Sequence, residues 1–277
     1  MRYYHPVESR FDARNRVSIE ILGSLRVSIE DRHDGIGANR VRTLLAVLSF
    51  SPGEVVSMDV LIEELFSDQA SKNPKNALQA NMRRLRTSLE AVTGVPGNLL
   101  VPTSANGYLL DLPPEAVDAR RFDALAARGA ALLRDQPYEA AQRLEEALRL
   151  WRGPALLDVS GGLRCHSQVN RLNSRRLDAL EDLYEARLSV GAEGNAVNEL
   201  EQLACEHPER ERMSELLMLA LYRAGRQGEA LATFQRVRSW LNNELGLEPR
   251  KKMRGLQQAI LAQDPSIDAG LVWADAR

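Results

Sequence analysis

Residues 73–89 read NPKNALQANMRRLRTSL, and this stretch predicts one amphipathic helix. Asn73 is a residue type that caps helix N-termini, Pro74 suits the first helical position, and Gly94 is suited to end the helix. At about 100° per residue, four apolar side chains share one face, with the other three within ~40° of Leu78. They are Leu78, Met82, Leu85 and Leu89. The helix should therefore pack this face against a core and leave the opposite face open.

The opposite face is basic, and the chain has no acid between Asp68 and Glu90. Surface helices usually mix acids with bases, because opposite charges three or four residues apart stabilise them. Arginine reads guanine bidentately, asparagine and glutamine read adenine, and a small side chain lets the backbone approach. We therefore expect base-facing positions at Asn76, Gln79, Ala80, Arg83 and Arg84. Phosphate contacts, which set register, are expected from Lys72, Lys75, Arg86 and Thr87.

The surrounding elements distinguish a DNA-reading helix from an ordinary solvated one. Residues 17–30 alternate apolar and polar, which predicts two short strands or a hairpin. A helical stripe begins at Arg40, and Ser57 is placed to cap a second helix. After the third helix, two apolar runs flank Asn106-Gly107, a strong hairpin signal. Strands, three helices and a hairpin in this order are typical of a winged helix-turn-helix, which favours DNA recognition.

Beyond Pro113-Pro114 the pattern is helical almost to the end of the chain. The expected helices cover 118–134, 138–151, 164–190, 194–206, 210–224, 227–243 and 248–263. Apolar residues at helix-hairpin spacing make the later part resemble tetratricopeptide repeats, with an imperfect period. The expected fold is mainly α: an N-terminal OmpR-like winged helix-turn-helix (α+β) followed by an all-α tetratricopeptide-like domain. The expected divisions are an extension at 1–16, the winged helix at 17–112, the helical domain at 113–265 and a tail at 266–277.

The composition is typical of a globular protein, with 44% hydrophobic and 27% charged residues among 277. A net charge of −2 gives no general attraction to nucleic acid, so the local basic stripe is what matters. No run approaches the ~18 apolar residues that a membrane helix needs, and the N-terminus lacks the apolar core of a signal peptide. Two cysteines, Cys165 and Cys205, fit a reducing compartment. We expect a cytoplasmic, nucleoid-associated protein with no membrane partner.

The sequence shows no constellation for catalysis or metal binding. The four histidines are scattered, no partner stands at zinc spacing from Cys165-His166, and no GxSxG or GxxxxGK[ST] motif occurs. We expect no enzyme activity, no metal and no cofactor. Other conspicuous side chains have structural explanations. Glu63-Glu64 and Glu145-Glu146 should be solvated on polar helix faces, and we expect packing for Cys205, Trp151 and Trp240.

Nine stretches between Ile21 and Pro265 carry a resemblance to one family. They are ILGSLRV (21–27), NRVRTLLAVL (39–48), VVSMDVLIEELF (55–66), NALQANMRRLRTSL (76–89), NGYLLDL (106–112), ARRFDAL (119–125), ALRLWRGPALLDV (147–159), LMLALYRAGRQGEALATFQRVRSWLNNELGLEP (217–249) and LQQAILAQDP (256–265). With these stretches the chain resembles the Streptomyces antibiotic regulatory proteins, a group of transcriptional activators, in their small stand-alone form.

The resemblance implies an OmpR-like DNA-binding domain followed by a bacterial transcriptional activation domain. It also implies binding to direct repeats near a promoter −35 region, contact with RNA polymerase holoenzyme, and activation of a secondary-metabolite (antibiotic) gene cluster. Two protomers would sit side by side on such repeats as a dimer on DNA. Arg40 and Arg42 match a basic, phosphate-facing pair of the family. In the wing, Thr103, Ser104 and Asn106 can bind phosphate, although the arginine common in family wings is missing.

An interaction scaffold is the alternative function. In that case the tetratricopeptide-like helices would bind other proteins, and the winged helix would bind DNA weakly or not at all. The acid-free basic helix argues against this alternative, whereas the uncharged wing and the net charge of −2 leave it open.

Overall fold

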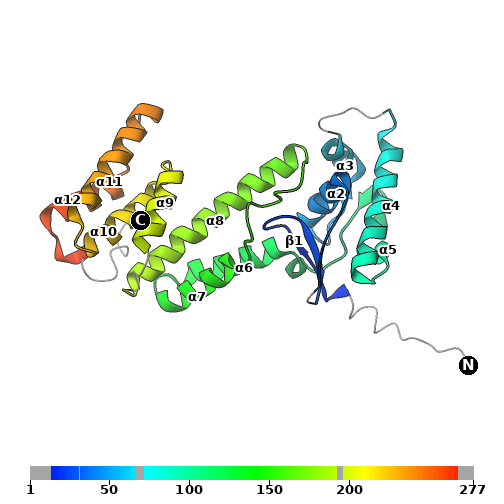
Figure 1. Ribbon diagram of the computed structural model, residues 1–277, viewed down its shortest axis with the longest axis horizontal. Helices are drawn as coiled ribbons and strands as arrows, with labels where there is room; N and C mark the ends of the chain where they lie inside the picture. Colours follow the sequence, from blue (N-terminus) through cyan, green and yellow to red (C-terminus); the bar gives the residue numbers. More distant parts are fainter. Residues whose placement is uncertain (1–13, 31, 67–71, 192–195, 268–277) are drawn as a thin grey trace, which may run out of the picture. The chain divides into compact units, whose positions relative to one another are not determined.

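The computed structural model describes residues 14–30, 32–66, 72–191 and 196–267. The chain forms two compact units, and each is considered by itself (Figure 1). The first unit comprises residues 1–125 and 146–176, and the second comprises 126–145 and 177–277. The first unit therefore takes in more than the winged-helix segment expected from the sequence. Most of the expected N-terminal extension and of the expected C-terminal tail lies outside the described residues.

A three-stranded antiparallel sheet begins the first unit, in the order β1-β2-β3. Its strands are β1 (Val17–Glu20), β2 (Arg26–Ile29) and β3 (Arg32–Gly35). β1 pairs with β2 from Val17 opposite Ile29 to Glu20 opposite Arg26, which confirms the predicted pair of strands. β3 was not predicted, because all four of its residues are exposed and RHDG shows no apolar alternation.

Three helices follow the sheet: α2 (Asn39–Ser49), α3 (Met58–Leu65) and α4 (Pro74–Thr93). The predicted caps are confirmed. The Ser57 hydroxyl accepts from the Val60 amide, and the Asn73 side chain accepts from the Asn76 amide at 3.2 Å. Gly94 ends α4 in the left-handed conformation, at φ 68°. The predicted core face is buried as well, and each of its four apolar side chains stabilises the fold by about 1.5–3 kcal/mol.

A second sheet forms the wing, in the order β4-β6-β5. Its strands are β4 (Val56–Ser57), β5 (Thr103–Ser104) and β6 (Gly107–Tyr108), and α5 (Gly97–Leu100) precedes β5. The predicted hairpin is confirmed, but Ser104 pairs with Gly107, so the turn lies one residue earlier than Asn106-Gly107. Gly107 is not among the glycines with positive φ. It is needed because a Cβ there would lie 1.9 Å from the Val56 carbonyl oxygen.

Arg86 ties α4 to the wing. Its Nε donates to the Val101 carbonyl and its Nη2 donates to the Thr103 hydroxyl, both at 2.8 Å. Its guanidinium also lies over the Tyr108 ring, 5.6 Å from the centroid. Arg86 thus has a structural role in addition to the phosphate contact expected of it, which stays a prediction. This half-buried side chain makes intramolecular bonds that a helical wheel could not reveal, because the partners come from beyond the helix.

The loop after β1 is completed by residues that lie far along the chain. The Asp118 carboxylate accepts from the Ile21 and Leu22 amides at 2.8 and 3.0 Å. The Arg152 amide donates to the Leu22 carbonyl, and the Leu156 amide donates to that of Ile21. Asp118 is the first residue of α6 (Asp118–Leu132), shortly after η1 (Pro114–Ala116). Arg152 and Leu156 lie between α7 (Pro137–Leu148) and α8 (Leu163–Ser189). Residues 146–176 thus belong structurally to the first unit.

Glu64 joins α3 to the N-terminus of α8. Its carboxylate accepts from the amides of Arg164 and Cys165, at 2.7 and 3.1 Å, and only 4% of the residue is exposed. A carboxylate is stabilised there by amide groups that have no partner within the helix. The expectation that Glu64 is solvated is therefore wrong. Its neighbour Glu63 is exposed, as expected.

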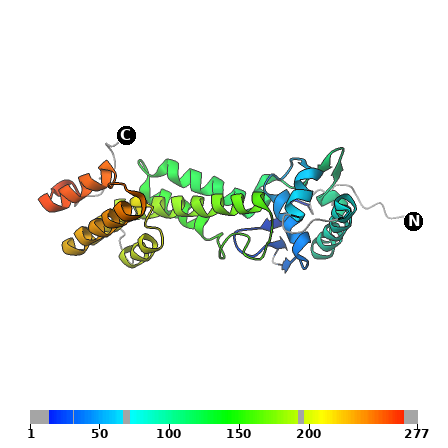
Figure 2. The same ribbon diagram turned by 90° about the horizontal axis from the view of Figure 1, so that it is seen from above.

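Helices dominate the second unit, and α10, α11 and α12 lie side by side in both ribbon views (Figures 1 and 2). α10 supplies the centre of the core, with every residue from Met213 to Leu221 buried. The later elements are α9 (Ala196–Glu206), α10 (Glu211–Arg223), α11 (Gln227–Trp240), the π-helical turn η2 (Leu241–Leu245), α12 (Lys251–Ala262) and η3 (Pro265–Ile267). The predicted helices are thus confirmed to within a few residues.

The two tryptophans expected to pack do so. Trp151 is 9% exposed in the first unit and meets Phe122 edge to face, with ring centroids 5.4 Å apart. Trp240 packs against the core of the second unit. The expectation for Cys205 is wrong, because this residue is exposed. Within the described residues, no helix combines the length and the apolar character needed to cross a bilayer.

We expect Glu64→Ala to lower the free energy of unfolding by about 1–3 kcal/mol, because two amides at the start of α8 lose their acceptor. Denaturant unfolding would measure this loss. Hydrogen exchange of the Arg164 and Cys165 amides should also become faster. Glu63→Ala is the matched control and should change stability by less than about 0.5 kcal/mol. Equal effects of the two substitutions would show that Glu64 does not cap α8.

We expect Arg86→Ala to lower the free energy of unfolding by about 1–2 kcal/mol, since the Val101 carbonyl loses its donor and Tyr108 loses its cation. Arg83→Ala, three residues earlier on α4, removes an exposed arginine and should change stability by less than about 0.5 kcal/mol. Denaturant unfolding of both variants distinguishes a structural arginine from a free one. An unchanged midpoint for Arg86→Ala would contradict the assigned role.

Candidate nucleic-acid interface

The open face of α4 is the candidate interface. All five residues predicted to face bases are exposed: Asn76, Gln79, Ala80, Arg83 and Arg84. They are held there because the opposite face of α4 is buried against α2, α3 and β2. A rigid helix with a small residue at the centre of a polar face can enter a groove closely. The exposure of these residues is confirmed, while their contacts with bases stay a prediction.

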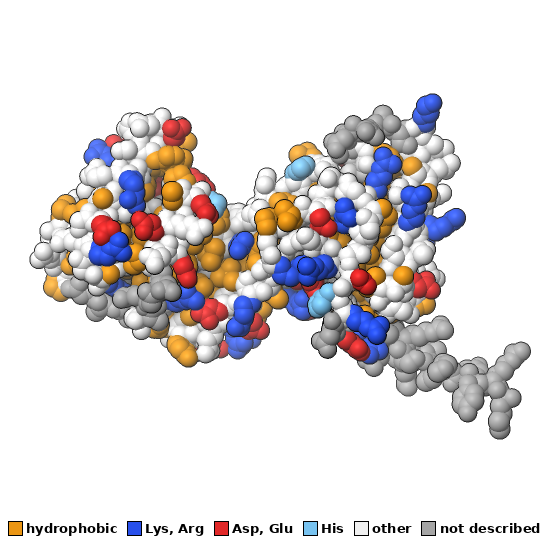
Figure 3. Space-filling view, in the orientation of Figure 1, with side chains coloured by type: hydrophobic (Ala, Val, Ile, Leu, Met, Phe, Trp, Pro, Cys, Tyr) orange, Lys and Arg blue, Asp and Glu red, His pale blue; other side chains and the backbone are white. Residues whose placement is uncertain are grey.

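Four cations on and beside α4 have side chains that are available to an external partner. Across the described residues, the side chains of Lys72, Lys75, Arg83 and Arg84 form neither a hydrogen bond nor an ion pair. Figure 3 shows the Lys and Arg side chains that gather over α4. Because no acid compensates them, these groups form a local positive surface on a chain whose net charge is −2. Such a surface attracts phosphate groups.

The two arginines expected to form a phosphate-facing pair differ from each other. Arg40 is exposed, and its guanidinium lies 5.0 Å from the centroid of the Phe66 ring. Arg42 is half-buried, and its Nε donates to the Asp158 carbonyl at 2.9 Å. Its Nη1 donates to the carbonyls of Ile36 and Gly37. The phosphate contact stays a prediction for both residues, but Arg42 already donates to backbone carbonyls, whereas Arg40 keeps an accessible charge.

The wing offers hydroxyl and amide groups without a cation. Thr103 and Asn106 are exposed and Ser104 is half-buried. The Thr103 hydroxyl accepts from Arg86, and the Asn106 carbonyl accepts from the Met58 amide. On α4 itself, the hydroxyl of Thr87 donates to the Arg83 carbonyl at 3.1 Å. The hydroxyl groups of Thr103 and Ser104 can still donate to phosphate oxygens, whereas the hydroxyl of Thr87 already donates to the Arg83 carbonyl.

Sequence reasoning missed two residues that shape this interface. The backbone carbonyl of Asp158 accepts from Arg42. The carboxylate of Asp158 accepts from the Leu25 amide at 2.7 Å. Tyr108 provides the ring beneath Arg86. Both occur in the stretches that carry the family resemblance, but no spacing rule connects them to their partners. In the part of the chain that the structure describes, no three His, Cys, Asp or Glu side chains cluster in a way that could hold a metal ion.

Comparisons with known proteins agree with this geometry. Residues 37–110 match the family model of the C-terminal domain of transcriptional regulatory proteins, and residues 117–261 match that of the bacterial transcriptional activator domain. The chain is 43% identical to the transcriptional regulator RedD of Streptomyces coelicolor over 90% of this chain and 71% of that protein. It is 36% identical to the regulatory protein DnrI of Streptomyces peucetius over 91% of this chain and 94% of that protein.

A solved structure has the same architecture. It is Mycobacterium tuberculosis EmbR in complex with a low-affinity phosphopeptide, with a TM-score of 0.84 and 28% sequence identity. The match covers 91% of this chain and 68% of that chain. The OmpR-like winged helix, the all-helical activator region and the similar proteins all indicate the same family. The chain belongs to the Streptomyces antibiotic regulatory protein family of transcriptional activators.

Proposed function

We propose that this activator binds promoter DNA by inserting α4 into the major groove. The observation that carries the proposal is the exposed face of α4, where the side chains of Arg83 and Arg84 have no partner among the described residues and the sequence has no acid between Asp68 and Glu90. Arg83 and Arg84 would pair with guanines, and Asn76 and Gln79 with adenines. Ala80 would allow close approach.

Phosphate contacts would fix the register of α4 in the groove. Lys72 lies just before α4 and Lys75 lies in its first turn, and both are exposed. Arg40, at the start of α2, is exposed as well. Thr103, Ser104 and Asn106 would bring the wing to the sugar-phosphate backbone through neutral groups. A neutral wing has little attraction to a narrow minor groove, which favours cationic side chains. We therefore assign most of the sequence recognition to α4.

The family supports the wider function that we propose. Two protomers would bind direct repeats side by side and in the same orientation, and repeats about one helical turn apart would place both on one face of the DNA. Bound near the −35 region, they would recruit RNA polymerase holoenzyme and switch on an antibiotic biosynthetic cluster. In this proposal residues 17–112 bind DNA and the helical domain at 113–265 provides the activating surface. Residues 113–125 and 146–176 of that domain also complete the first compact unit.

The first experiment is a footprint of the full chain on the promoters of its neighbouring gene cluster. Protection over two direct repeats, lost in the Arg83→Ala/Arg84→Ala double variant, is the expected result. Arg128→Ala is a control for the loss of a surface arginine outside α4, because Arg128 is exposed on α6. Absence of protection even at low salt would favour the scaffold function instead.

Arg84→Ala should weaken binding to the cognate repeat by about 1–3 kcal/mol, because one bidentate base contact is lost. The same variant should tolerate changes at a single base pair better than the wild type does. Competition binding with a set of single-base-pair variants of the repeat measures both effects. A uniform loss across all variants would show that Arg84 contacts phosphate and not a base.

Lys75→Ala should weaken binding to cognate and unrelated DNA alike, since a phosphate contact carries no sequence information. The slope of log K against log salt concentration should become shallower by about 1. Fluorescence anisotropy at several salt concentrations measures this slope. An unchanged slope would remove Lys75 from the interface.

A further inference from the structure

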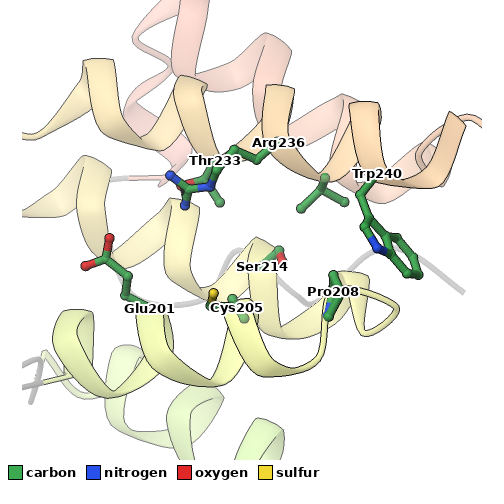
Figure 4. A pocket seen from close by; sticks show the side chains of 9 residues that line it. Glu201, Cys205, Pro208, Ser214, Thr233, Arg236 and Trp240 are labelled. Atoms are coloured by element: carbon green, nitrogen blue, oxygen red, sulfur yellow. Dashed lines mark hydrogen bonds between the residues drawn. The ribbon is translucent and has the colours of Figure 1, made fainter. Parts of the chain in front are cut away.

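A pocket of about 570 Å³ lies within the second unit, between α9, α10 and α11. This volume is in the range of pockets that hold small organic ligands. α9 contributes Ala204 and Cys205, α10 contributes Ser214, and α11 contributes Arg236 and Trp240. Figure 4 shows Cys205, Ser214 and Arg236 around a common space, with the Trp240 ring at one end. Nothing in the proposed DNA contacts uses this pocket.

Arg236 brings an uncompensated positive charge to the pocket. Of the four arginines on α10 and α11, Arg212 and Arg238 pair with carboxylates, and Arg223 donates to two backbone carbonyls. Arg236 reaches the Thr233 hydroxyl at 3.0 Å, and it has no carboxylate partner among the described residues. Arg236 is exposed, and a guanidinium at a pocket that is not paired with a carboxylate favours an anionic ligand.

Ser214 provides a second, independent polar group. The residue is fully buried, with 0% exposure, and lines the pocket. Its hydroxyl has no hydrogen-bond partner in the part of the chain that the structure describes. A buried hydroxyl without a partner costs free energy, which a ligand that hydrogen-bonds to it would recover.

The rest of the lining favours an aromatic or other flat apolar body. Trp240, Val237 and Pro208 offer apolar surface toward the pocket. Glu201, the one acid in the lining, lies at the opposite end from Trp240 in Figure 4 and is exposed. We propose that this pocket binds a small aromatic monoanion, with its carboxylate or phenolate at Arg236 and Ser214 and its ring toward Trp240. The site would make the activator responsive to a metabolite of this chemical class.

The test uses 2-naphthoate as the probe and its neutral analogue 2-naphthamide, titrated calorimetrically into the full chain. We expect saturable binding of one naphthoate with a dissociation constant at or below about 1 mM. Arg236→Gln should weaken naphthoate binding about tenfold or more, and Ser214→Ala about three- to tenfold. 2-Naphthamide should bind the wild type and Arg236→Gln with similar affinity, because it carries no charge for Arg236 to recognise.

Arg238→Gln is the matched control, since it makes the same substitution on the same helix outside the pocket lining. It should leave the affinity for naphthoate within about twofold of the wild type, since a solvent-exposed ion pair contributes little. The proposal fails if naphthoate shows no saturable binding. It also fails if Arg236→Gln binds naphthoate as tightly as the wild type does.

Cys205 locates the bound probe without any substitution. Its thiol is exposed at the pocket lining, whereas Cys165 is buried in the first unit. Burial, with the nearby Glu64 carboxylate, raises the pKa of the Cys165 thiol far above its ordinary range, so Cys165 should stay unreactive. Iodoacetamide should therefore label Cys205, and saturating naphthoate should slow this labelling. An unchanged rate under saturation would place the probe elsewhere and overturn the assignment.

Discussion

The backbone of the loop that follows β1 imposes the constraint on which the first unit depends. Ile21, Leu22 and Leu25 are at most 1% exposed, so their amide and carbonyl groups cannot be satisfied by water. Their partners are the carboxylates of Asp118 and Asp158 and the amides of Arg152 and Leu156. A winged helix that ended near residue 112 would lack all of these partners. The start of the helical domain is therefore a structural part of the winged-helix unit.

Opposing effects set the pKa of the Asp118 carboxyl group. Burial raises its pKa to about 6, and this outweighs the amides of Ile21 and Leu22 and the charge of Arg152, which lower it. Because the folded-state pKa exceeds the unfolded one, the native state binds the proton more tightly. The contribution of Asp118 to stability is therefore full at acid pH and decreases as pH rises from about 4 to about 6. The hydrogen bonds are kept because the loop amides have no other acceptor.

The same packing separates structural arginines from free ones. Arg42 donates to carbonyls around the start of α2, and Arg86 joins α4 to the wing. Both therefore position the helix that would meet DNA. Arg83 and Arg84, on the other side of α4, have no such partners among the described residues. Three arginines within four residues thus serve two purposes: Arg86 fixes the helix, while Arg83 and Arg84 remain available.

Most of the fold follows from local sequence signals. Asn73, Pro74 and Gly94 set the limits of α4, and apolar spacing sets its core face, because capping and periodicity act over a few residues. The exposed face of α4 could be predicted for the same reason. β3 could not, since four exposed residues carry no alternation. The roles of Glu64 and Arg42 could not either, because their partners lie 100 and 116 residues away along the chain.

The net charge of the chain is a poor guide to its interface, because the acids and bases are sorted locally. In the second unit, Arg212 pairs with Asp182 and Glu185 at 2.7 and 2.6 Å, and Arg250 pairs with the buried Glu215 at 2.7 Å. Charges paired at contact distance cancel and produce little field beyond a Debye length of about 8 Å at physiological salt. Among the described residues, Lys75, Arg83 and Arg84 of α4 have no such partners and keep their full attraction for phosphate. A slightly acidic chain can therefore present a strongly basic surface where the fold leaves arginines unpaired.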